Sequence, residues 1–231
     1  PSGSSDDGLV YEGVTDVTAA LSTVAAATAT TVSVANVQTM QGENCHAGWS
    51  LTVVYRFPAF NCLSGAADNA GVGANARNDY RNVAIYDGFL RQQDGAADTT
   101  TTLSGFLPAQ PGPDNLRLGA VAWEGDQFLE DDQMKVKSNL SASATAVNPA
   151  GPSGTDNFFD SGKQTAADHN ADLDDDPDSG ASIQQGYTAG RGDGHGLDAK
   201  TQPVQVPGGT SSIDVTFTTD SDQYYPGQFA L

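Results

Sequence analysis

Apolar and polar residues alternate with a period of two along several short stretches of the chain. The clearest is 212–218, where polar residues separate Ile213, Val215 and Phe217. Residues 49–55 are rich in the aromatic and β-branched side chains that favour strands. Successive side chains of a strand point to opposite faces, so this pattern predicts strands with one face in a core. The predicted strands are 9–18, 31–37, 49–55, 81–86, 99–107, 116–123, 133–136, 202–206, 212–218 and 224–230.

The residues between these stretches favour turns rather than helices. The chain of 231 residues contains 26 Gly, 11 Pro and 25 Asp, but only 4 Glu. Asp favours turns and caps, whereas Glu favours helix interiors. Because no strand–helix–strand rhythm is present, we expect an all-β fold, an antiparallel β-sandwich or jelly roll.

The predicted organisation is one sandwich domain at 19–231 that follows an extended segment at 1–18. A long Asp/Gly-rich insertion loop, at about 141–199, holds few large apolar residues. A loop of that length inside a compact domain needs a stabiliser, such as a metal, a partner chain or packing on the sheet. We expect 1–18 to pair with an open sheet edge of a neighbouring subunit.

The formal net charge of -19 restricts the classes of partner. A field this negative repels phosphate backbones and anionic lipid, which argues against nucleic acid as a partner and against membrane docking. No apolar run is long enough for a transmembrane span, so no membrane insertion is expected. The low Lys content indicates either a surface adapted to high salt or carboxylates neutralised by calcium. Both interpretations place the protein outside the cytosol, extracellular or at the cell surface.

An Asp-rich stretch at 172–178 is the main candidate for metal binding. Alternate carboxylates in a loop that ends in Gly180 suit Ca²⁺, which takes six to eight oxygen ligands. The stretch is not an EF-hand, since Pro177 and Ile183 occupy the positions that need Gly and Glu. A solvated acidic loop remains the alternative. The candidate calcium ligands are Asp172, Asp174, Asp176, Asp178, Asp193 and Asp198.

Cys45 and Cys62 are the two cysteines of the chain. In an oxidising compartment a disulfide between them would close a loop of about 17 residues, which contributes roughly 3 kcal/mol to stability in the chain-entropy model. Their spacing does not match a zinc motif. We expect the disulfide, and two unrelated buried thiols are the alternative.

Catalytic templates do not fit the sequence. The segment 48–52 lacks the closing Gly of a nucleophile elbow, and no H-E-x-x-H motif is present. The sequence therefore predicts a protein that is not an enzyme, with no catalytic residues. Trp123 and Tyr187 are candidates for a sugar-binding platform, but Trp123 is expected to face the core at a strand end.

Several segments together resemble a domain of bacterial secreted and cell-surface proteins that is found in adhesin-like or matrix-like chains. The resemblance spans nearly the whole chain and implies an extracellular β-rich module. It brings no enzymatic role. The segments that carry it are VANVQ at 34–38, AGWSLTVVY at 47–55, RNVAIYDGF at 81–89, GAVAWEGD at 119–126, NP at 148–149, NFFDS at 157–161 and TTDSDQYYPG at 218–227.

The functional hypothesis is a non-catalytic extracellular structural protein that self-associates into a surface filament, sheath or matrix. Calcium or high salt would reduce the repulsion between its acidic loops. The alternative is a lectin-like carbohydrate-binding or adhesin domain, whose partners would be surface glycans or other surface proteins.

Overall fold

The computed structural model divides the chain into two compact units, Pro1–Trp49 and Ser50–Leu231. It describes residues 10–22, 31–38, 48–54, 82–112, 115–123, 131–147, 158–159 and 197–231, with only the backbone of 197–201.

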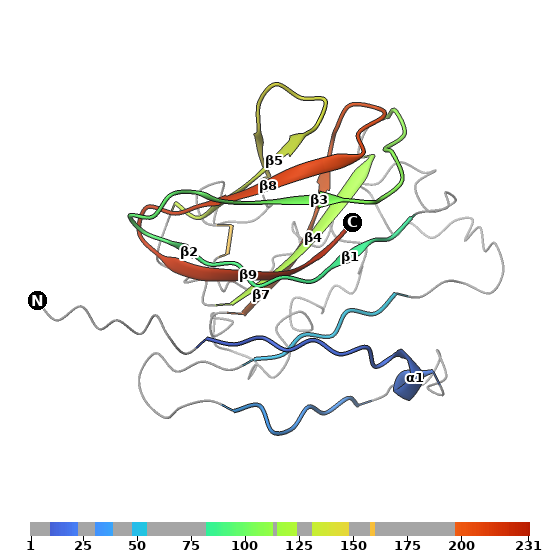
Figure 1. Cartoon of the computed structure of the whole chain (residues 1–231), viewed down its shortest axis with the longest axis vertical. Coiled ribbons are helices and arrows are strands. Elements are labelled where there is room, and N and C mark those ends of the chain that lie inside the picture. The colour runs from blue at the N-terminus through green and yellow to red at the C-terminus, as the bar shows by residue number, and fades with distance from the viewer. Residues whose placement is uncertain are drawn as a thin grey trace, which may run out of the picture. The chain divides into compact units, whose positions relative to one another are not determined.

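The second unit is a β-sandwich of two antiparallel sheets (Figure 1), as the alternation predicted. One sheet has the strand order β1-β9-β4-β7, with β2 also paired to β9, and the other has the order β3-β8-β5-β6. The jelly-roll topology stays a prediction. The strands are β1 Ile85–Tyr86, β2 Gln92–Gln93, β3 Thr99–Ser104, β4 Leu116–Trp123, β5 Gln133–Ser138, β6 Thr145–Val147, β7 Leu197–Val204, β8 Ser212–Thr218 and β9 Gln223–Ala230.

Alternating burial along the strands forms the core between the sheets. In β8, Ile213, Val215 and Phe217 are buried and the residues between them are half-buried. Strand β4 follows the same rule, with Leu118 and Ala122 fully buried. Since each strand buries every second side chain, a shift of one residue in register would move its apolar set to the solvent.

Aromatic side chains make the largest part of this core. Phe159 contacts Phe158, Phe217 and Tyr224, with ring centroids 4.8, 6.1 and 5.1 Å away. Phe217 in turn packs against Phe229 of β9 at 5.8 Å. Phe158 and Phe159 belong to the NFFDS segment of the family resemblance, and both side chains are fully buried. Phe159 therefore joins the two sheets, because it packs against Phe217 of β8 and Tyr224 of β9.

Side chains from the other sheet hold both ends of the edge strand β3. The Tyr86 hydroxyl donates to the Ser104 carbonyl at 2.9 Å. The backbone N–H of Thr99 donates to Oε1 of Gln92 at 2.8 Å, and Gln92 is buried. These bonds connect the sheets on this side and occupy backbone groups that an exposed edge would offer to another strand.

The described part of the first unit holds extended chain and one helical turn, α1 Thr18–Leu21. The Tyr11 hydroxyl donates to the Gln38 carbonyl at 2.6 Å and accepts from the Gln38 N–H at 2.9 Å. Among the described residues, no helix is long and apolar enough to cross a membrane.

The predictions of strands at 9–18, 31–37 and 49–55 are wrong for the described residues of those ranges. None of these residues belongs to a ladder, and α1 occupies the end of the first range. Asn36 has a φ of 62°, which interrupts the extended backbone of the second. Composition suits a strand here, but a strand also needs a partner for its backbone hydrogen bonds, and β-propensity does not supply one.

Gly227 lets Trp123 lie against β9. The pairing of β4 with β9 shifts register between Ala120 and Ala122, which brings Trp123 opposite Tyr225. A Cβ at Gly227 would lie 2.1 Å from Cζ3 of the indole, so no side chain fits at this position.

We therefore expect Gly227→Ala to lower the free energy of unfolding by about 1–3 kcal/mol, because the indole or the strand must move. Urea denaturation measures the effect. Gly88→Ala is the matched control, since its Cβ would meet only the Gly227 carbonyl oxygen, at 4.0 Å. Equal stability of the two variants would contradict the close approach of Trp123 to β9.

Candidate functional site

Most of the predicted calcium ligands lie outside the described residues. Asp198 is part of β7, where its backbone lies opposite Ala122 of β4. The described residues contain no group of three or more His, Cys, Asp or Glu side chains arranged to hold a metal. The calcium hypothesis and the disulfide therefore stay predictions. Eight of the candidate residues named from the sequence lie outside the described ranges: Asp172, Asp174, Asp176, Asp178, Asp193, Cys45, Cys62 and Tyr187.

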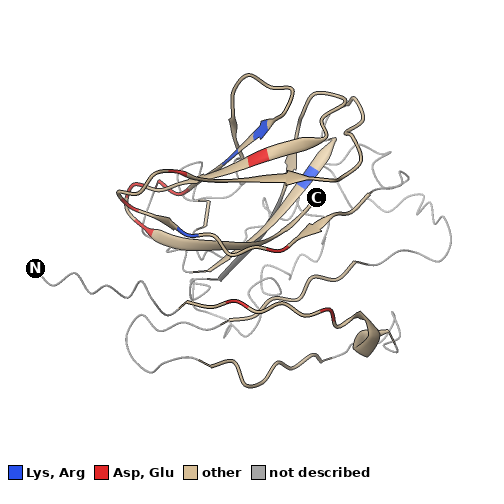
Figure 2. Cartoon of the chain, in the orientation of Figure 1, with Lys and Arg blue, Asp and Glu red and all other residues tan. Residues whose placement is uncertain are grey.

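Acidic residues gather at one end of the sandwich, around the loops that join β2 to β3 and β8 to β9 (Figure 2). The two loops are joined where the N–H of Asp94 donates to the Asp222 carbonyl at 2.8 Å. Asp222 folds back on its own loop, and its Oδ1 accepts from the N–H of Gln223 at 2.6 Å. Asp132, which is fully buried, also belongs to this end.

Tyr224 is the buried group that these carboxylates surround. Burial raises the pKa of Tyr224 well above its ordinary value, and the charges of Asp132, Asp222 and Asp98 raise it further. Its hydroxyl donates to the Thr218 carbonyl at 3.0 Å. A phenol that stays protonated at neutral pH is neither a nucleophile nor a base, so Tyr224 acts here as a hydrogen-bond donor.

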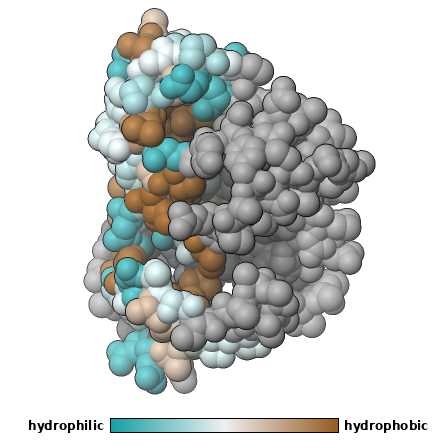
Figure 3. Space-filling view, turned by 90° about the vertical axis from the view of Figure 1, so that its right-hand side faces the viewer, coloured by the Kyte–Doolittle hydropathy of each residue, from teal (hydrophilic) through white to brown (hydrophobic). Residues whose placement is uncertain are grey.

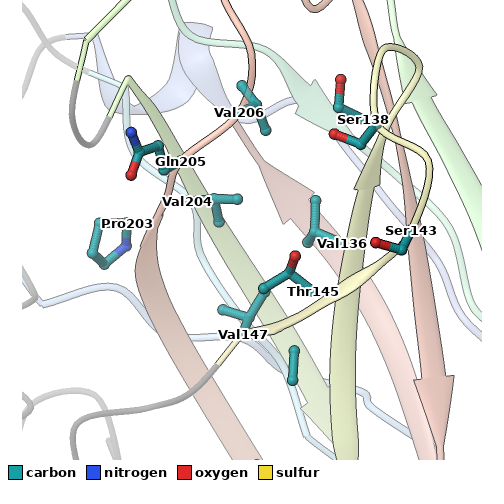
Figure 4. Close-up of a pocket in the computed structure, with 11 residues that line it drawn as sticks. Val136, Ser138, Ser143, Thr145, Val147, Pro203, Val204, Gln205 and Val206 are labelled. Carbon is teal, nitrogen blue, oxygen red and sulfur yellow. The ribbon is translucent and has the colours of Figure 1, made fainter.

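A pocket of about 180 Å³ opens between the sheets at the end formed by β5, β6 and the last residues of β7 (Figure 4). Val136 and Val147 line it from β5 and β6, and Val204 and Val206 line it from the other sheet. All four valines are buried. We call this pocket the β6–β7 cleft.

The described residues that line the β6–β7 cleft include no charged side chain. Ser143 and Thr145, both exposed, add hydroxyl groups to its lining. The described lining consists mostly of valine, alanine, proline and hydroxyl side chains. Such a lining is suited to contact an uncharged apolar group.

An aromatic cluster lies on the outer face of the larger sheet. The Phe89 and Tyr225 rings stack, with centroids 5.3 Å apart and an interplanar angle of 9°. Trp123 adjoins them, 6.0 Å from Phe89. The expectation that Trp123 faces the core is wrong. Burial alternates along β4, so Trp123 lies on the face opposite Leu118 and the rest of the core.

A polar chain runs beside this aromatic cluster. Nη2 and Nε of Arg91 donate to Oε1 of Gln223 at 2.7 and 3.2 Å. Nε2 of Gln223 then donates to the Tyr225 hydroxyl at 2.7 Å. Aromatic rings next to amide and guanidinium groups are the chemistry that binds sugar rings, which lie flat on an aromatic face.

Exposed apolar side chains mark the extended segments of the chain. In the first unit, Val10, Tyr11 and Val14 are 53, 63 and 59% exposed, and Val34 is 47% exposed. In the second unit, Leu51 and Val53 are exposed as well. Figure 3 shows apolar atoms at the surface of the described residues. Exposed apolar groups of this kind, on extended chain that pairs with no described strand, are a candidate interaction surface.

Comparison with protein-family models, with curated proteins and with solved structures found no match. The sites described above therefore rest on geometry and chemistry.

Sequence reasoning missed the β6–β7 cleft and the acidic setting of Tyr224. The apolar positions of the cleft are visible in the sequence, since Val204 and Val206 alternate with polar residues. Their meeting with Val136 and Val147 depends on how two sheets close over each other, which no local pattern encodes. The Asp residues at the acidic end looked like ordinary turn residues.

The buried phenol of Tyr224 predicts a loss of stability in alkali. The unfolded chain ionises tyrosine with a pKa of about 10, whereas folded Tyr224 ionises only at higher pH. Its contribution is complete below about pH 10 and decreases as the pH rises above that value. We expect Tyr224→Phe to lose less free energy of unfolding than the native chain between about pH 8 and about pH 10.5.

Urea denaturation at the two pH values measures this difference. Tyr11→Phe, which removes an exposed hydroxyl, is the control and should behave as the native chain does. A Tyr224→Phe variant that loses as much stability in alkali as the native chain would contradict the burial of this phenol.

Proposed function

We propose that this protein is a non-catalytic extracellular structural protein whose copies self-associate into a filament, sheath or matrix. The observation that carries the proposal is the set of exposed apolar side chains on extended chain outside the sandwich, among them Val10, Tyr11, Val14 and Val34. Folding leaves this surface in water, whereas association would cover it.

The free energy gained by burying these apolar side chains favours association of copies over exposure to water. Each buried valine or tyrosine side chain gains about 1.5–3 kcal/mol relative to an exposed one. Several such groups on each copy make a contact that offsets the entropy lost on binding when they pack well. The resemblance to domains of bacterial surface proteins supports the same function.

The net charge of -19 opposes self-association and makes it depend on ions. Copies of one acidic chain repel each other over a Debye length, which falls from about 30 Å at 0.01 M salt to about 8 Å at 0.15 M. Calcium would reduce the repulsion more locally if Asp172, Asp174, Asp176 and Asp178 bind it. We therefore include calcium stabilisation in the proposal.

Sedimentation velocity tests the proposal. The native chain should be largely monomeric at about 0.01 M ionic strength and should form larger species at about 0.15 M, because screening removes the repulsion. A monomer under both conditions, at all protein concentrations, would contradict self-association.

The calcium part is tested with CaCl₂ and MgCl₂ at equal ionic strength. Calcium should promote assembly more than magnesium does, and this excess should be absent when the four Asp residues at 172, 174, 176 and 178 are changed to Asn. The matched control changes Asp94, Asp98, Asp131 and Asp220 to Asn, which alters the charge equally. If both quadruple variants keep the excess, the loop at 172–178 is not the calcium site.

The aromatic cluster of Phe89, Trp123 and Tyr225 supports a second candidate function, carbohydrate binding. A glycan array with the native chain should then give binding that Trp123→Ala reduces by tenfold or more, because the variant removes one of the aromatic rings on which a sugar would lie. Phe106→Leu, a change in the core, is the control for general loss of structure. No glycan bound by the native chain would contradict this candidate.

A further inference from the structure

We propose that the β6–β7 cleft of one copy receives residues 31–35 of a second copy as an added strand. The inference rests on the proposed self-association and names the two surfaces that make the contact. Figure 4 shows the acceptor, with valines on both sides of the opening.

The cleft lies at the side of the sandwich where the described strands β6 and β7 each have a single partner strand. Strand β6 has three residues and pairs only with β5 among the described strands, and β7 pairs only with β4. The opposite side is closed, because side chains of Gln92 and Tyr86 hold the ends of β3. An extended segment that lay between β6 and β7 would continue the smaller sheet and cover the valines below it.

A buried donor near the cleft also lacks an acceptor. Gln202 is 3% exposed, and its Nε2 has no hydrogen-bond partner among the described residues. It precedes Val204 by two residues in β7, so both side chains lie on the same face of the strand. A buried amide without a partner lowers stability, and a backbone carbonyl of an added strand is the kind of acceptor it needs.

Residues 31–35 are the described segment that best fits the cleft. Their backbone makes no hydrogen bond to the backbone of another described residue. Val32 and Val34 are two residues apart, so they lie on one face of the extended chain, as Val204 and Val206 do on the other side of the contact. Side chains of this size suit a pocket of about 180 Å³.

The lack of charged residues distinguishes 31–35 from one of the two other exposed segments, 10–17, and a hydrogen bond distinguishes it from the other, 48–54. Residues 17–42 contain no Asp, Glu, Lys or Arg, in a chain whose net charge is -19. The described lining of the cleft has no charged side chain either, so the contact between these residues buries no ion. The segment 10–17 includes Glu12 and Asp16, and in 48–54 the Thr52 hydroxyl already bonds to the side chain of Gln228 in β9.

A contact between two different surfaces is heterologous and builds an open chain of copies. This geometry allows a complementation test. Val34→Asp disables the donor segment, and because Val34 is 47% exposed the fold should persist. Ser143→Arg obstructs the cleft from an exposed position on its lining. Each variant alone should be monomeric at 0.15 M salt, with association at least roughly tenfold weaker than in the native chain.

An equal mixture of the two variants should form dimers and nothing larger. The intact segment of the Ser143→Arg chain enters the intact cleft of the Val34→Asp chain, and the remaining two surfaces are both disabled. Sedimentation velocity measures the sizes. Leu107→Asp, at an exposed apolar residue outside the contact, and Thr100→Arg, on the outer face of β3, should both assemble as the native chain does.

The outcomes separate this inference from the proposed function. A native chain that never assembles contradicts both. A native chain that assembles together with Val34→Asp or Ser143→Arg overturns the inference and leaves self-association standing. Two monomeric variants whose mixture stays monomeric also overturn it. If circular dichroism finds Ser143→Arg unfolded, Thr145→Arg replaces it at the next exposed lining position.

Discussion

The burial of every second side chain between two sheets is the constraint on which the rest of this structure depends. The chain carries one carboxylate for about every eight residues, so it has few ways to place apolar groups together without also burying charge. Alternation with a period of two makes this possible within each strand, because the apolar side chains lie on the face toward the core and the polar ones on the opposite face. Several of the described acidic residues then lie at one end of the sandwich, where the β2–β3 and β8–β9 loops meet.

The edges of the sheets follow from the same constraint. A sandwich must end somewhere, and its outer strands carry backbone groups that need partners. At the edge strand β3, the side chains of Gln92 and Tyr86 supply such partners from the other sheet. On the β6–β7 side the sheets separate around a pocket lined by valines. The two sides of the sandwich therefore differ. The proposed heterologous contact uses only the β6–β7 side, as the surface that accepts a segment of another copy.

Strands were predicted correctly from the sequence where their alternate apolar residues are buried in the core. Strand predictions were wrong where the described residues have no core to fill. Residues 212–218 and 116–123 form strands because their alternate apolar residues fit a core that other strands complete. Residues 31–37 have an equally clear alternation, but no described strand pairs with them and Asn36 adopts a positive φ. For Trp123 the error was one of face. The sequence placed it in the core at a strand end, whereas the alternation along β4 puts it on the opposite face, against Gly227.

The strong negative charge and the proposed self-association are compatible because they involve different parts of the chain. The two proposed contact surfaces are residues 31–35 and the described lining of the β6–β7 cleft. Neither includes a charged side chain, so the proposed contact brings no like charges together. The carboxylates act at longer range, through a repulsion that salt screens. Short-range apolar packing then determines which surfaces meet, and the ionic medium determines whether the copies approach closely enough to meet at all. A chain of this kind would remain dispersed at low ionic strength and would assemble in a saline or calcium-containing medium outside the cell.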